Sequence, residues 1–253
     1  MTKEKVLEWV KRSVSYLLGM FLIAFGISIA VKSNLGVSPA TSLPYVLSKK
    51  WSGLSLGTWT TIVYCVLVLV QLVLLRKDFK WYYVLQFAVS TVFGFFVDGA
   101  AWLAQFCIPD VSLYVLRFLY TLLSMVFIAF GVTLYLAGNI MCMPAEGVAL
   151  ALSKCTKWQV STCKTITDMS IAVSALVFSL IFFHRLDGIR EGTLLLAFGI
   201  GFMMKPINRF IKKPLHQFLY GKGEATSTAE IGTAETAEVS ETSSQESETE
   251  EEN

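Results

Sequence analysis

Residues 33–42 read SNLGVSPATS, a polar stretch with Gly and Pro that follows the mostly apolar residues 14–32. A second polar stretch, GNIMCMPAEG, occupies residues 138–147 and also follows a long apolar run. In each, a proline opens a short segment that can form a helix. The doubling predicts a chain built from two related halves.

Composition sets the class of protein. The chain is 54% hydrophobic and 13% aromatic, with only 16% charged residues, which departs strongly from the average of soluble domains. We therefore expect an integral membrane protein whose main partner is the lipid bilayer.

The C-terminal segment has a different character. Residues 221–253 contain ten of the nineteen acidic residues, a single lysine and no aromatic residue. Such a segment cannot bury enough apolar surface to offset the entropy lost on ordering. The prediction is a disordered, acidic, cytoplasmic tail.

Six apolar segments are long enough to cross a membrane, since about 20 helical residues span a hydrocarbon core of about 30 Å. They are residues 14–32, 57–75, 81–105, 113–138, 164–183 and 191–211. Each must be helical, because lipid offers no hydrogen-bond partner to the backbone. Residues 1–13 alternate charged and apolar side chains, which favours a basic lead-in at the membrane interface.

Two further segments, residues 39–50 and 144–155, have helical character but are too short to span. Twelve helical residues reach only about 18 Å. Each is either a half-helix that enters the membrane and returns, or a helix that lies along its surface.

The two halves are related by a sequence repeat. Shifting the chain by 105 residues makes ten of the twenty-seven positions from 23 to 49 identical. Later in the chain, a shift of 104 aligns GTWTTI (57–62) with STCKTI (161–166), and a shift of 107 aligns GFFVD (94–98) with GFMMK (201–205). The units are residues 14–108 and 113–211, each with three spans and a short helix. Because three is odd, the second unit must be inverted in the membrane relative to the first. The predicted fold is thus an all-α polytopic membrane protein with two inverted three-span repeats.

The distribution of basic residues predicts the orientation. With the N-terminus in the cytoplasm, fifteen Lys and Arg residues lie on cytoplasmic segments and six lie elsewhere. An eight-crossing chain, in which the short helices also span, gives the same count. Segment length favours six spans, with both termini in the cytoplasm.

The short helices carry lysines at their C-terminal ends: Lys49 and Lys50 in the first, Lys154 in the second. Ammonium groups must reach water or lipid headgroups, so an inserted short helix has its N-terminus at the deep end. A buried helix N-terminus presents free N–H groups and positive partial charge, which suits an anionic group. The alternative is an ordinary turn at the membrane surface, copied by duplication.

This reasoning selects candidate substrate-binding residues around both prolines. They are Asn34, Ser38 and Thr41 in the first half, and Asn139 and Glu146 in the second. Thr41 aligns with Glu146 in the repeat. The carboxylate of Glu146 either caps its helix or coordinates a cation, and unequal ends suit a zwitterion or a cation-coupled substrate.

Asp98 is the remaining candidate, because GFFVDGAA places a carboxylate within a predicted span, where charge is costly. Three roles would explain such a charge: Asp98 faces an aqueous cavity, it pairs with a partner on another helix, or it carries a proton. Motifs of catalysis, of phosphate binding and of metal binding are missing, so we expect no enzyme, no cofactor and no nucleic-acid partner.

The elements NLGVSPAT, LGTWTTIV and GFFVDGAAWL together resemble the pattern of the YczE/YyaS/YitT family of bacterial membrane proteins. The resemblance covers residues 14–211. In the second half MPAEG is similar to the family's Gly-Pro-acidic-Gly element, with Met143 in place of the first glycine. The resemblance implies a polytopic inner-membrane protein.

Two functions from different classes fit these expectations. One is a secondary transporter or permease for a small polar solute or ion, bound near the bilayer midplane. The other is a non-transporting scaffold or accessory factor, with the acidic tail as the contact to a partner.

Overall fold

The computed structural model describes residues 3–76, 81–109, 113–184 and 191–220, and these are helical apart from the connections. The elements are α1 (Lys3–Ser33), α2 (Pro39–Lys50), α3 (Leu56–Leu75), the 3-10 turn η2 (Trp81–Val84), α4 (Leu85–Cys107), α5 (Tyr114–Gly138), α6 (Pro144–Thr156), α7 (Val160–Phe183) and α8 (Glu191–Tyr220). The tail expected over residues 221–253 lies outside the described residues.

Six of these helices are long and apolar enough to cross a membrane, which confirms the predicted number of spans in the described residues. The lead-in expected over residues 1–13 is helical from Lys3 and continues into the first span without a break. Helix α7 begins at Val160, four residues before the expected position, and α8 continues past the span to Tyr220. The two short segments form α2 and α6, which begin at Pro39 and Pro144 as expected.

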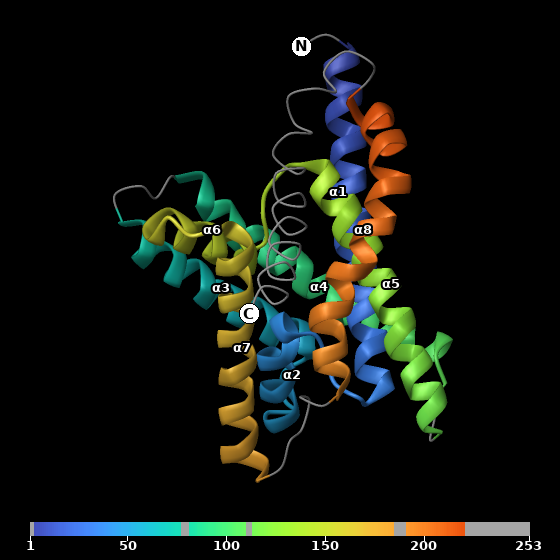
Figure 1. Cartoon of the computed structure of the whole chain (residues 1–253), viewed down its shortest axis with the longest axis vertical. Helices are drawn as coiled ribbons and strands as arrows, with labels where there is room; N and C mark the ends of the chain where they lie inside the picture. The colour runs from blue at the N-terminus through green and yellow to red at the C-terminus, as the bar shows by residue number, and fades with distance from the viewer. Residues whose placement is uncertain (1–2, 77–80, 110–112, 185–190, 221–253) are drawn as a thin grey trace, which may run out of the picture.

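The central pair of the bundle is α1 and α5, which run antiparallel (Figure 1). Arg12 and Ser15 of α1 bond to the carbonyls of Gly138 and Leu134 at the end of α5. Farther along α1, Gly26 lies against Ser124, so position numbers rise in one helix as they fall in the other.

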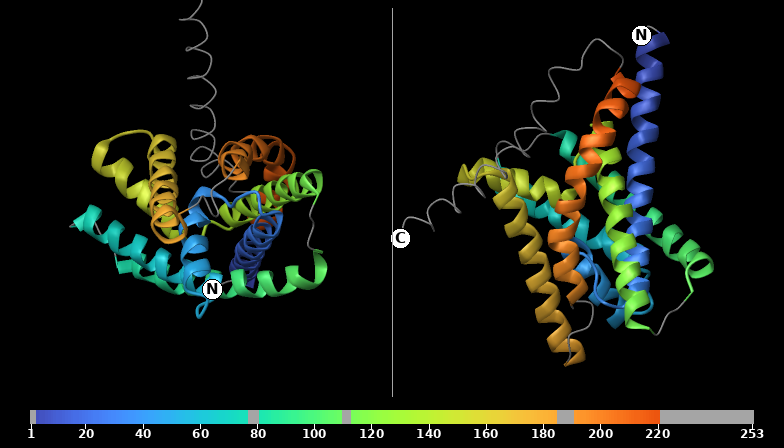
Figure 2. Two further views of the ribbon diagram at one scale, coloured as in Figure 1. Left: turned by 90° about the horizontal axis from the view of Figure 1, so that it is seen from below. Right: turned by 45° about the vertical axis from the view of Figure 1, so that its right-hand side comes forward.

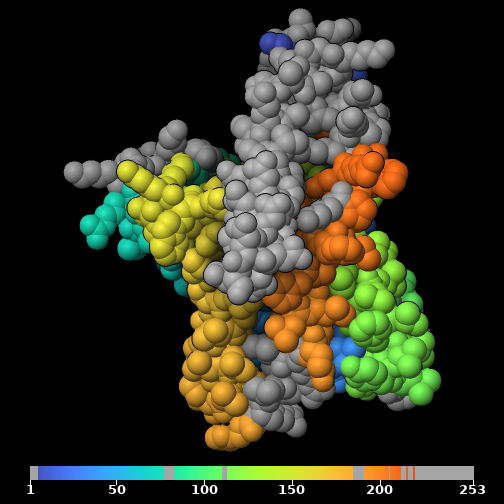
Figure 3. Space-filling view, in the orientation of Figure 1, coloured from blue at the N-terminus to red at the C-terminus, as the bar shows by residue number. Residues whose placement is uncertain are grey.

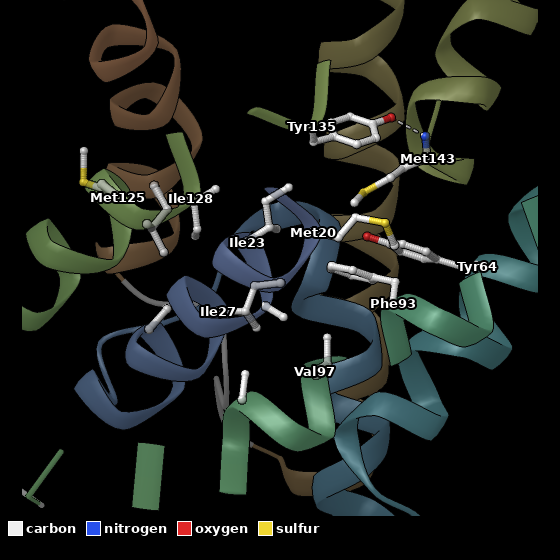
Figure 4. Packing of buried hydrophobic residues seen from close by; sticks show 14 of the residues in the cluster. Met20, Ile23, Ile27, Tyr64, Phe93, Val97, Met125, Ile128, Tyr135 and Met143 are labelled. Carbon is white, nitrogen blue, oxygen red and sulfur yellow. Dashed lines mark hydrogen bonds between the residues drawn. The ribbon is translucent and has the colours of Figure 1, made fainter. Parts of the chain in front are cut away.

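Glycines permit the close approach of this pair. A Cβ added to Gly19 would meet the backbone of Gly131 and Tyr135, and one added to Gly131 would meet the backbone of Gly19 and Ile23. Small residues serve this purpose in membranes, where packing rather than hydrophobic burial drives helix association. The core forms at the crossing, where Met20, Ile23 and Ile128 are buried (Figure 4).

The other helices form two groups around this pair. Helix α4 packs on α1 and α8 packs on α5, whereas α2, α3, α6 and α7 pack on one another. Helix α4 also packs on α3 and so connects the two groups. Seen from below, α7, α3 and α2 lie to one side of α1, α5 and α8 (Figure 2).

Each short helix packs against a span from the other half of the chain. Helix α2 contacts α7, and α6 contacts α3, in addition to the spans that follow them directly. The two sequence halves are therefore interlocked around α2 and α6 and do not fold side by side as separate units.

Candidate functional site

The N-terminus of α2 is buried, and the hydroxyl groups of Ser38 and Thr41 there interact with each other. Asn34 has φ 54° and Gly36 has φ 130°, and these left-handed residues turn the chain from α1 toward α2. Thr41 donates a hydrogen bond from Oγ1 to the Ser38 carbonyl at 3.2 Å, and the two hydroxyl oxygens are 2.9 Å apart. Pro39 occupies the first turn, where its missing N–H has no helical partner to lose.

The N-terminus of α6 is held by a tyrosine from the preceding span. Tyr135, 1% exposed, donates from its hydroxyl to Oε2 of Glu146 at 2.6 Å. The same hydroxyl oxygen accepts the backbone N–H of Met143 at 2.6 Å (Figure 4). One phenol thus satisfies an N–H at the start of α6 and fixes the carboxylate that lies one turn into it.

Both N-termini meet at one cavity of about 370 Å³ in the interior of the bundle. From α2 and its cap it is lined by Ser38, Pro39 and Thr41, and from α6 by Ala145 and Glu146. Side chains of α1, α3, α5, α7 and α8 complete the wall, so both halves contribute. The structure therefore brings three of the six predicted site residues, Ser38, Thr41 and Glu146, to one place.

Helix α7 adds two charges to this cavity. Lys164 Nζ lies 3.6 Å from Oδ2 of Asp168 one turn away, and both residues line the wall. The other carboxylate oxygen of Asp168, Oδ1, is buried with no hydrogen-bond partner among the described residues. Buried carboxylate oxygens generally accept hydrogen bonds, so Oδ1 of Asp168 can accept one from a donor group in the cavity.

The cavity extends between α7 and α8. Met169 of α7 is 38% exposed and Phe198 of α8 is 73% exposed, and both belong to its wall. These two helices lie on the same face of the molecule (Figure 3). The remaining wall is largely apolar and includes Tyr64 and Leu196.

The structure places the other three predicted residues elsewhere. Asn34 and Asn139 follow the ends of α1 and α5 in the left-handed conformation, at φ 54° and 44°, and both are exposed. Asn is favoured in this conformation at helix ends, which accounts for its recurrence in the repeat. Asp98 caps α3: it accepts the Gly57 N–H at 2.7 Å and the Ser55 hydroxyl at 2.6 Å.

Tyr135, Lys164 and Asp168 are not among the site residues predicted from the sequence. Tyr135 belongs to no recognisable motif. The repeat does not single it out either, because the equivalent position in the first half is Ala30. The spacing of four between Lys164 and Asp168 places both on one helix face, and their side chains form an ion pair at 3.6 Å. What the spacing could not indicate is that this face lines the cavity.

The described residues include no group of three or more His, Cys, Asp or Glu side chains placed to hold a metal ion. Cys142, just before α6, lies close to Glu146. Burial and then the charge of Glu146 raise the pKa of its thiol above the ordinary value.

Six helices long and apolar enough to span, two short helices and a cavity lined by both halves are the architecture of a multi-pass membrane protein. The chain belongs to a family of unknown function, DUF6198, whose model matches residues 10–209.

Two relatives from Bacillus subtilis (strain 168) are similar to it. The uncharacterized membrane protein YczE is 25% identical over 176 residues, covering 69% of this chain and 76% of its own length. The uncharacterized protein YyaS is 26% identical over 167 residues, covering 64% of this chain and 79% of its own. The expected relationship to YczE and YyaS is thus confirmed. No solved structure matches the chain.

Proposed function

We propose that this protein is a secondary permease that moves a small polar solute or ion through the cavity between its two halves. The observation that carries the proposal is the convergence of the α2 and α6 N-termini, with Ser38, Thr41 and Glu146, on one interior cavity. A scaffold that only packs gains nothing from polar groups around a cavity, because removing polar groups from water costs free energy.

The proposal includes an inverted repeat, and the α1–α5 contact supports it. Positions 19, 23 and 26 align with 124, 128 and 131 in the repeat. Gly26 lies against Ile128 and Ser124, and Gly131 lies against Ile23 and Gly19, so equivalent residues exchange their contacts. Reciprocal contact between equivalent surfaces is the signature of two-fold symmetry, and because the helices are antiparallel the axis lies across them.

We further propose that α2 and α6 are half-helices inserted from opposite faces. Both prolines are buried, and the lysines at the other ends, Lys49, Lys50 and Lys154, are partly or fully exposed. This polarity is what an inserted half-helix requires, with its electropositive end at the depth of the site and its charged end in water. The topology we propose has both termini in the cytoplasm, so α2 enters from outside and α6 from inside.

The chemistry of the cavity favours a solute with both donors and acceptors. Hydroxyls of Ser38 and Thr41 at the start of α2 suit an anionic or carbonyl group. The carboxylates of Glu146 and Asp168 suit an ammonium group or a coupling cation. The transport we propose needs no covalent step, no cofactor and no nucleic acid.

The test is solute exchange in proteoliposomes. Vesicles that contain the purified protein and identical vesicles without it are loaded with defined sets of labelled amino acids, amines, organic acids and nucleobases. The proposal expects one set to exchange only when the protein is present. It also expects Glu146→Gln to lower that exchange about tenfold or more, which is the loss of one charge-assisted contact.

A matched control is Glu8→Gln, because Glu8 is an α1 carboxylate outside the cavity, paired with Arg12 at 3.8 Å. Exchange should survive this change. If no set exchanges, and removal of residues 222–253 abolishes a cellular effect that Glu146→Gln leaves intact, the accessory-factor alternative replaces the permease.

A further inference from the structure

The two halves differ at one pair of equivalent helix contacts. Helices α3 and α4 touch through their backbones: a Cβ added to Gly57 would meet the Gly94 carbonyl, and one added to Gly94 would meet the backbone of Gly57. The hydroxyl of Thr61 donates to the Ser90 carbonyl at 3.3 Å. The pair is closed along this face.

Two further contacts hold α3 against α4. Tyr64 and Phe93 stack with ring centroids 5.7 Å apart and planes 5° from parallel, and both are buried. At the end of the pair, Asp98 of α4 accepts both the hydroxyl of Ser55 and the N–H of Gly57 at the start of α3. Charge-assisted bonds to a helix N-terminus of this kind are strong.

The equivalent pair in the second half is α7 and α8, and it is separated. The repeat aligns α3 with α7 at a shift of 104 residues, and α4 with α8 at a shift of 107. The contact residues Gly57, Thr61, Tyr64, Ser90, Phe93 and Gly94 therefore correspond to Ser161, Thr165, Asp168, Ala197, Ile200 and Gly201. Every one of the six counterparts lines the cavity.

The separation is visible at Gly201, where an added Cβ would meet no atom within 4 Å, whereas at its counterpart Gly94 it would meet Thr61 and Gly57. Among the described residues, α8 packs chiefly on α5 and makes no extended contact with α7. Yet Ser161, Thr165, Ala197 and Gly201 are small, as residues at close helix contacts in membranes are. The α7 and α8 faces thus have the composition of a closed contact but enclose the cavity.

We propose that the protein has a second state, in which α7 closes on α8 through Ser161, Thr165, Ala197 and Gly201 while α3 separates from α4. The structure described here is then the state with the α3–α4 pair closed and the α7–α8 pair open. This inference rests on the proposed permease and its inverted repeat, since each half then adopts the arrangement of the other. If both termini are cytoplasmic, the open α7–α8 pair faces the cytoplasm. The bonds from Asp98 to Ser55 and Gly57 then close the α3–α4 pair on the outer side.

Two cysteine pairs test the exchange, in a chain whose five native cysteines are replaced. Thr61→Cys with Ser90→Cys reports closure of α3 on α4, and Thr165→Cys with Ala197→Cys reports the same contact in the second half. Under oxidation in membranes, each pair alone is expected to form its crosslink. In the four-cysteine chain, the first crosslink formed should prevent the second.

The proposal is overturned if the Thr165–Ala197 pair never crosslinks while the Thr61–Ser90 pair does so fully. It is overturned equally if both crosslinks form in the same molecule. Gly201→Ala gives an independent check, because its methyl group has room in the present state and would meet α7 in the second. The second crosslink should then be lost while the first is retained. Gly99→Ala is the control, since an added Cβ there also meets nothing within 4 Å.

The crosslinks are read without any solute, so the two proposals can fail separately. Mutually exclusive crosslinks in a protein that exchanges no solute would remove the permease and retain the two states. Solute exchange that persists after the Thr61–Ser90 crosslink is complete would retain the permease and remove the second state.

Discussion

Tyr135 and Glu146 join a span to a short helix by a hydrogen bond of 2.6 Å from the phenol to the carboxylate. Because the same phenol oxygen accepts the Met143 N–H, the start of α6 has one anchor with two contacts. Helix α6 has thirteen residues and is too short to hold its position by its own helical stability. The position of Glu146 at the cavity therefore depends on Tyr135.

Tyr135→Phe removes both contacts and leaves the Met143 N–H without its partner. We expect a loss of about 1–3 kcal/mol in the free energy of unfolding, the usual result of an unsatisfied buried group. Thermal unfolding in detergent measures it. Tyr120→Phe is the control, because its exposed hydroxyl makes one bond of 3.3 Å to the Pro109 carbonyl. Equal thermal stability of the two variants would contradict the anchor.

The Cys142 thiol reports the charge of Glu146. Burial and the nearby carboxylate both raise the pKa of Cys142, so at neutral pH less of it is thiolate, the form that reacts with maleimides. Glu146→Gln removes the negative charge, which lowers this pKa and increases the thiolate fraction. We therefore expect faster labelling in the variant, and a labelling curve that shifts to lower pH.

The measurement needs a chain in which Cys142 is the only cysteine, with the labelling rate followed from neutral to alkaline pH. Glu8→Gln in the same background should leave the rate unchanged. A slower reaction in Glu146→Gln would show that the carboxylate activates the thiol, contrary to the expected sign.

Much of this fold follows from sequence pattern. The lengths of the apolar runs indicated six spans, and Ser-Pro and Met-Pro marked where α2 and α6 begin. Asn34 and Asn139 show the limit of such reasoning. An asparagine that ends a helix in the left-handed conformation looks the same in sequence as one that binds a ligand, and the repeat copies either.

The candidate site was harder to predict, because its residues are brought together and held by contacts between segments that are distant in the sequence. Asp98 was identified as a charge that needs a reason, but only the structure provides Ser55 and Gly57 as its partners. Tyr135 lies in an apolar run in which a phenol has no distinguishing neighbour. Local pattern thus located the short helices but not the residues that hold them.

The Lys164–Asp168 ion pair on α7 should stabilise the fold more than its partial exposure suggests. The side chains are 45% and 26% exposed, and the pair spans 3.6 Å at the cavity wall. We expect Asp168→Asn to destabilise the protein more than the double change Lys164→Met with Asp168→Asn, since the single change leaves the charge of Lys164 unpaired at the cavity wall. A double-mutant cycle of thermal stability should give a coupling of about 1 kcal/mol. A coupling of zero would mean that solvent already screens the pair.

Two buried glutamines lie against the first turn of α6. A Cβ added to Gly147 would meet Gln71 Oε1 from α3 and, at 2.9 Å, Gln86 Nε2 from α4. Both glutamines are fully buried, at 1% and 0% exposed, so close packing leaves their side chains little room to move away. Gly147→Ala should therefore lower stability by about 1–3 kcal/mol through overpacking, although alanine favours a helix.

Relief of the crowding distinguishes this cause from a backbone effect. Adding Gln71→Ala to Gly147→Ala removes the nearest obstacle, so the double variant should unfold at a higher temperature than Gly147→Ala alone. Gly99→Ala is again the control, because it adds the same methyl group to a helix with no atom within 4 Å. If Gln71→Ala brings no recovery, α6 is positioned by Tyr135 alone and the two glutamines do not set its depth.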